Sequence, residues 1–95
     1  SLPTSANQED HVSMATFAAR RLHTMLDNTS GVVAIEWLCA AQAIEFHRPL
    51  RSSDAIEAQL ARLRTQVARL SVDRLMAPDI EAATALVAAG VAAPA

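Results

Sequence analysis

The densest group of chemically reactive side chains in this sequence is Gln8, Glu9, Asp10 and His11, directly ahead of a long apolar segment. A carboxylate accepts hydrogen bonds or takes part in proton transfer, and an imidazole serves as an acid, a base or a metal ligand. Glu9 and Gln8 stand directly ahead of a predicted helix, where helices tend to present reactive groups, so both are candidate site residues. Their position alone assigns neither of them a role.

Two plainer interpretations of the same residues remain open. A carboxylate near the start of a helix also interacts with the helix dipole, which is worth about 0.3–1 kcal/mol. Asp10 and His11 could form part of a metal site, but two ligands are too few and His23 is not spaced to join them. The sequence therefore predicts no metal site, and His11 is best explained as a hydrogen-bonded structural residue.

The elements that must position Glu9 are helical. Glycine and proline are sparse, which leaves long stretches without a helix breaker. We expect a loop over residues 1–9 and then a long helix over residues 10–46, capped by either Asp10 or Ser13. Asn28 to Gly31 is the soft point, so the segment forms either one continuous helix or two collinear helices with a bend there.

The second half of this segment, from Val32 to Phe46, is apolar almost all round the helix axis, with Glu36, Gln42 and Glu45 as its polar breaks. Helices of this kind lie in the interior of larger proteins. A single rod of about 34 residues would be roughly 50 Å long, whereas a compact chain of this size has a radius of gyration near 12 Å. The pattern predicts a strut in a larger helical bundle.

Two shorter helices are expected to follow. Pro49 ends the long helix, and Asp54 with Glu57 three residues later is typical of a capping arrangement for a helix over residues 54–69. Pro78 favours the first turn of a last helix over residues 78–89, with Gly90 as its C-cap. No strand-like alternation is present, so the predicted fold class is all-α.

Composition narrows the classes of function. The chain is 52% hydrophobic with only three aromatic residues, and it carries more apolar surface than a 95-residue unit can hide, so we expect partners outside it. The eight arginines are scattered among ten acidic residues, which argues against nucleic-acid binding. The apolar run from Gly31 to Phe46 is shorter than the roughly 20 residues of a membrane span. The single Cys39 is expected to be a buried, inert thiol in a reducing cytoplasm.

Several stretches together resemble the C-terminal part of the aromatic amino-acid lyase family. They are the run from Asn7 to Met14, Ala18-Ala19-Arg20-Arg21, Glu36-Trp37-Leu38 and Ala77-Pro78-Asp79-Ile80-Glu81, and the resemblance covers about residues 5–90. It implies that residues 1–95 are the C-terminal helical segment of a cytoplasmic, homotetrameric ammonia-lyase. This segment alone would be inactive, because the rest of the parent polypeptide is needed.

The resemblance gives Glu9 a specific role. Histidine-acting members of the family carry glutamate at this place, whereas phenylalanine- and tyrosine-acting members usually carry glutamine. The implied reaction converts L-histidine to trans-urocanate and ammonia, with Glu9 contacting the imidazole and Gln8 lining the edge of the site. Two alternatives stay open: a tyrosine or phenylalanine ammonia-lyase or aminomutase of the same family, and a stand-alone helical module that self-associates.

The family's electrophile is a methylidene-imidazolone prosthetic group that forms from an internal Ala-Ser-Gly. Thr29-Ser30-Gly31 is superficially similar, but its first residue is threonine and the family's tripeptide lies far upstream of the matched region. The resemblance therefore implies that the group forms in the upstream part of the parent protein. No cofactor-binding residue is expected in this chain.

Overall fold

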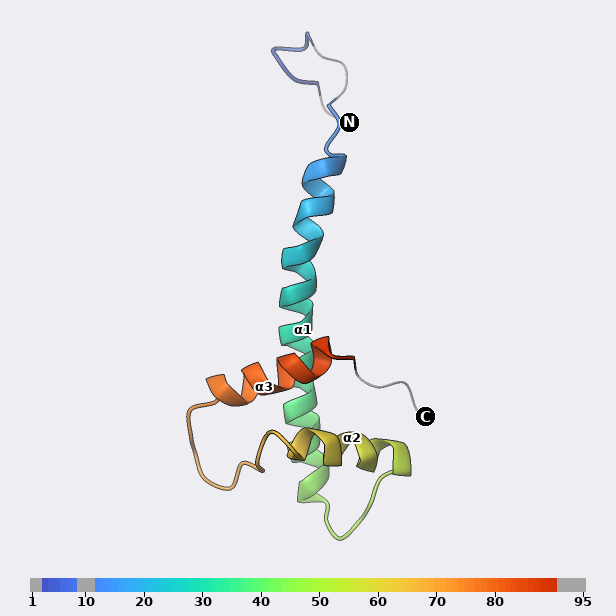
Figure 1. Ribbon diagram of the computed structural model, residues 1–95, viewed down its shortest axis with the longest axis vertical. Helices are drawn as coiled ribbons and strands as arrows, with labels where there is room; N and C mark the ends of the chain where they lie inside the picture. The colour runs from blue at the N-terminus through green and yellow to red at the C-terminus, as the bar shows by residue number, and fades with distance from the viewer. Residues whose placement is uncertain (1–2, 9–11, 91–95) are drawn as a thin grey trace.

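The computed structural model describes residues 3–8 and 12–90 of the chain. Three helices follow one another: α1 over Ala15–Phe46, α2 over Asp54–Arg64 and α3 over Ala77–Ala88. No strand occurs in these two ranges, which confirms the all-α prediction. The molecule is elongated, 68 × 33 × 20 Å along its principal axes, because α1 extends well beyond the two short helices that lie across its C-terminal half (Figure 1).

Helix α1 runs without interruption through the expected soft point, so the continuous alternative is the one that forms. Thr29 donates its hydroxyl hydrogen bond to the carbonyl of Met25 at 2.7 Å, one helical turn back. A single glycine inside a helix costs only about 1 kcal/mol relative to alanine. The alanines that follow Gly31, at positions 34, 40, 41 and 43, favour the helix and offset part of that cost.

The predicted start of α1 was wrong. The helix begins at Ala15, and its N-cap is Met14, whose side chain makes no capping hydrogen bond within the described residues. Ser13 therefore lies outside the helix. Val12 and Ser13 have lower helix propensity than the following Ala-Thr-Phe-Ala-Ala, so the helix gains its first stable turn only where the alanines begin.

Helix α2 is shorter than the predicted 54–69, since it ends at Arg64. Thr65 explains the difference: its hydroxyl donates to the carbonyl of Arg62 at 2.8 Å, and its backbone N–H donates to the same oxygen at 3.2 Å. These i to i−3 bonds tighten the last turn and replace the bonds of a continuing α-helix. The chain then turns and buries Val67 in the core.

The start of α2 is capped one residue earlier than predicted. Ser53, and not Asp54, is the N-cap, and its hydroxyl accepts from the N–H of Ile56. Glu57 instead accepts from the N–H of Ser52 at 2.9 Å, and Arg48 donates to both of its carboxylate oxygens at 2.8 and 2.7 Å. This arrangement ties the end of α1 to the start of α2 across the turn that contains Pro49.

These bonds make α2 sensitive to acid. The hydrogen bonds from Arg48 and Ser52 and the nearby arginines lower the pKa of Glu57 from 4.5 to about 2. A carboxyl group with a depressed folded-state pKa stabilises the protein fully above its unfolded value and loses that effect as pH falls through the folded one. We therefore expect hydrogen-exchange protection of the first turn of α2 to fall between about pH 4.5 and pH 2. Glu57→Gln should lower that protection at neutral pH and flatten its pH dependence.

The matched control for this prediction is Glu81→Gln, which changes an exposed carboxylate on α3. It should leave the exchange of α2 unaltered across the same pH range. A Glu57→Gln protein whose α2 amides keep the acid transition of the unaltered protein would contradict the assignment to Glu57.

Helix α3 begins at Ala77 and ends at Ala88, one residue earlier at each end than predicted. Pro78 lies in its first turn, where the missing N–H removes no helical bond. Ala89 is the C-cap, and Gly90 follows with φ +91° and donates its N–H to the carbonyl of Val87. This left-handed conformation favours glycine, which explains why the helix stops here.

The core is small and lies where the three helices meet. It consists of one stripe of α1 and the inner faces of the other two helices: Ala34, Leu38, Ala41, Leu60, Leu63, Val67 and Ala83. Of the two short helices, α3 packs closely along α1. An interhelical clamp adds to this packing, because the side-chain amide of Gln42 donates to the carbonyl of Leu70 and accepts from its N–H, at 3.0 and 3.2 Å.

The rest of α1 is uncovered by the part of the chain that the structure describes. Large apolar side chains along it are 38–71% exposed: Phe17, Leu22, Met25, Leu26, Val32, Val33, Ile35 and Phe46. Cys39 is exposed as well, contrary to the expected buried thiol, because it lies on a face that α2 and α3 do not cover. Among the described helices, none is both long enough and apolar enough to cross a membrane.

Candidate functional site

The predicted catalytic residue, Glu9, lies outside the described residues. Gln8, the predicted substrate-binding residue, is exposed and closes a four-residue turn that starts at Ser5. The backbone N–H of Gln8 donates to the carbonyl of Ser5 at 3.1 Å. The turn therefore holds Gln8 by its backbone and leaves its side-chain amide in solvent.

This turn has an unusual backbone. Ser5, Ala6 and Asn7 have φ values of +49°, +56° and +67°, all in the left-handed region. For residues other than glycine that conformation costs roughly 1–2 kcal/mol each. Strained backbone of this kind concentrates at functional sites. The sequence offered one signal for it, Asn7, which tolerates the left-handed region better than most residues, whereas Ser5 and Ala6 gave none.

Helix α1 carries this turn at the end remote from the core, and the whole N-terminal half of the helix separates the two (Figure 1). At about 1.5 Å per residue, the 32 residues of α1 span roughly 48 Å. The first turn of α1 contains no acidic residue, so none of its own side chains offsets the positive end of the helix dipole. That end of the molecule favours a carboxylate nearby.

Thr29-Ser30-Gly31 does not fit a prosthetic group formed from an internal tripeptide. The three residues lie inside α1, and the Thr29 hydroxyl is bonded to the helix backbone. Cyclisation would require this backbone to leave the helix. The prosthetic group that the family resemblance implies therefore does not form at Thr29-Ser30-Gly31, and these three residues have no part in it.

The structure brings no metal-binding cluster together in residues 3–8 and 12–90, where no three His, Cys, Asp or Glu side chains converge. His23 is exposed on the uncovered half of α1. The acidic side chains near arginines serve as structural ion pairs instead. Arg64 binds Glu45 through two hydrogen bonds of 2.9 Å, and this contact lowers the pKa of the Glu45 carboxyl.

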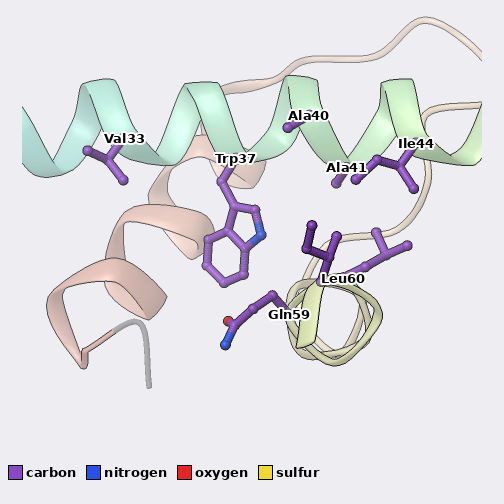
Figure 2. A pocket seen from close by; sticks show the side chains of 8 residues that line it. Val33, Trp37, Ala40, Ala41, Ile44, Gln59 and Leu60 are labelled. Carbon is purple, nitrogen blue, oxygen red and sulfur yellow. The ribbon is translucent and has the colours of Figure 1, made fainter. Parts of the chain in front are cut away.

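Two apolar grooves were not visible in the sequence, because each forms between helices that are distant along the chain. The first, which we name the Trp37 groove, has a volume of about 360 Å³ and lies between α1 and α2 (Figure 2). Its lining comprises Val33, Trp37, Ala40, Ala41, Ile44, Ile56, Gln59 and Leu60. The second, of about 320 Å³, lies beside Cys39, Gln42, Phe46 and the chain from Arg64 to Asp79.

Two polar atoms of α2 are buried without a hydrogen-bond partner in the described part of the chain. They are the side-chain oxygen Oε1 of Gln59 and the nitrogen Nη1 of Arg62. The other terminal nitrogen of Arg62 donates to the carbonyl of Leu86 at 3.2 Å, which joins α2 to α3. Unpaired buried polar atoms are rare in complete proteins, so each of these two calls for an explanation.

Comparison with known proteins points to one family. The sequence model of a family described as aromatic amino acid lyase matches residues 1–65. Histidine ammonia-lyase from Rhodospirillum rubrum is 60% identical over 90 residues, which make up 95% of this chain and 18% of that protein. Histidine ammonia-lyase from Shewanella oneidensis is 64% identical over 86 residues, or 90% of this chain and 17% of that protein.

A solved structure shows the same arrangement of helices. The crystal structure of histidine ammonia-lyase from Trypanosoma cruzi superposes with a TM-score of 0.81 at 39% sequence identity. The match covers 95% of this chain and 18% of that one. The chain thus spans less than a fifth of the length of the relatives that it matches.

Proposed function

We propose, from the premise that the chain belongs to the aromatic amino acid lyase family, that it is the C-terminal part of an enzyme that deaminates L-histidine. The products would be trans-urocanate and ammonia. The observation that carries the proposal is 60% identity to a histidine ammonia-lyase over 95% of the chain. Because the chain matches only 18% of that relative, the reaction is proposed for the parent enzyme and not for these 95 residues alone.

Glu9 is the residue to which we assign the substrate's imidazole. A carboxylate accepts a hydrogen bond from an imidazole N–H and favours its charged form, which an amide does less well. The strained turn from Ser5 to Gln8, which ends directly before Glu9, supports a functional role for this region. Gln8 would lie at the edge of the same site, and a general-base role for Glu9 is left open.

The remaining features of the enzyme follow from its family. The electrophile would be the methylidene-imidazolone group, formed from an Ala-Ser-Gly of the parent protein outside these residues, and it would activate the substrate for loss of ammonia. The enzyme would be a cytoplasmic homotetramer. The exposed apolar side chains of α1 support assembly of this kind, because large uncovered apolar patches mark protein interfaces.

An assay of the parent enzyme on three amino acids tests the substrate. We expect turnover of L-histidine, followed by the absorbance of urocanate, and little or no turnover of L-phenylalanine or L-tyrosine, followed by the absorbance of the corresponding cinnamates. The isolated 95-residue chain serves as the control and should turn over none of them. Preferred turnover of phenylalanine or tyrosine would move the proposal to another member of the family.

A further inference from the structure

The Trp37 groove has apolar walls and one polar atom that the described chain leaves unpaired. Val33 and Ile56 on its rim are 38% and 44% exposed, and the indole of Trp37 lies between α1 and α2 (Figure 2). Gln59 extends from α2 into the same space, and its Oε1 is buried without a hydrogen-bond donor among the residues described. A buried amide oxygen in that state is costly, because it has given up water and gained no partner.

The missing partner has a defined chemistry. It must fill apolar space of about 360 Å³ and bring one N–H or O–H donor to Gln59. A peptide segment meets both requirements, since its backbone carries an N–H and its side chains can be apolar. A small apolar ligand would not.

We infer that the Trp37 groove binds a peptide segment of the parent lyase that lies outside these 95 residues. This segment inserts an apolar side chain into the groove and donates a hydrogen bond to Gln59. The source of the segment follows from length: the chain corresponds to only 18% of its relatives, so most of the polypeptide that could cover the groove lies elsewhere in the parent. The inference rests on the proposed function only in that a longer lyase supplies the segment.

Whether one substitution raises or lowers the thermal midpoint of unfolding tests the hydrogen bond to Gln59. Gln59→Leu in the full-length parent protein removes the acceptor and keeps a side chain of similar size. If a segment donates to Gln59, its donor loses its partner and the thermal midpoint falls, by about 2 °C or more. If the oxygen is unpaired in the parent protein too, the same substitution relieves a cost and raises the midpoint, which would overturn the inference. Gln66→Leu, at an exposed glutamine just beyond α2, is the matched control and should change the midpoint little.

Photo-crosslinking identifies the segment directly. A benzophenone-bearing phenylalanine replaces Ala40, which is exposed on the groove wall, and in a second protein it replaces Ala61 on the exposed face of α2. After irradiation of the full-length protein, the adduct at position 40 should map by mass spectrometry to a peptide outside residues 1–95. That adduct should be several-fold more abundant than the one from position 61. Adducts confined to residues 1–95, adducts to a different protein, or equal yields at both positions would each overturn the inference.

These readouts do not depend on catalysis. A parent protein that fails to deaminate L-histidine would refute the proposed function while its crosslinks and midpoints still report on the groove. Conversely, an active enzyme whose groove gives no outside adduct would retain the proposed function and lose this inference.

Discussion

Replacing Glu9 by alanine in the parent enzyme should lower kcat for L-histidine by roughly ten- to ten-thousand-fold. The lower part of that range corresponds to a lost contact with the imidazole, and the upper part to lost charge stabilisation or proton transfer in the transition state. Steady-state kinetics with urocanate absorbance as the readout measures the effect. Glu9→Gln separates the two contributions, because it retains a hydrogen-bond acceptor and removes the charge.

The control for Glu9 is Glu36→Ala, which removes an exposed carboxylate from the middle of α1. It should leave kcat and KM close to those of the unaltered enzyme. Near-normal kcat and KM in Glu9→Ala itself would remove Glu9 from the site. A change of KM alone would instead mean that Glu9 binds substrate and transition state equally well.

Leu63→Ala should destabilise the packing of α2 and α3 against α1 by about 2–5 kcal/mol. Leu63 is fully buried and belongs to the same core cluster as the small residues Ala34 and Ala83. Removing its side chain would leave a cavity in this small core. Native-state hydrogen exchange of the α2 amides in the parent protein measures the local loss of stability.

Leu75→Ala is the matched truncation, because Leu75 is 77% exposed in the connection between α2 and α3. A surface substitution of this kind should change stability by less than about 0.5 kcal/mol. If Leu63→Ala altered the exchange of α2 no more than Leu75→Ala does, the core would not be the contact that holds α2 in place.

The sequence was sufficient to predict which segments form helices, but it did not predict every residue at which these helices end. Long alanine- and leucine-rich stretches between prolines predict three helices because helix propensity and apolar periodicity agree there. The end of α2 could not be predicted, since it depends on the Thr65 hydroxyl preferring the carbonyl of Arg62 over solvent. The start of α2 at Asp54 was predicted correctly, but its capping residue was not, because Ser53 is the N-cap and Glu57 binds Arg48 from across the turn.

The candidate site was predicted from resemblance and not from pattern. Composition and spacing alone would have left Glu9 as an ordinary carboxylate near a helix end. The left-handed turn from Ser5 to Asn7 was invisible, because only Asn7 has a side chain suited to it. The Trp37 groove was likewise hidden, since its two walls come from residues 33–44 and 56–60 and meet only after folding.

Under the homotetrameric assembly proposed above, the exposed N-terminal half of α1 bears on when the parent enzyme would become active. Its described side chains make few contacts beyond their own helical turns, whereas the C-terminal half is already packed against α2 and α3. A helical extension held mainly by a neighbour is ordered by mass action, because each association event stabilises only the folded form. The turn at the tip of α1 would then acquire its working geometry late, after subunits meet. Specific activity should accordingly decline on dilution, before the core around Leu63 unfolds.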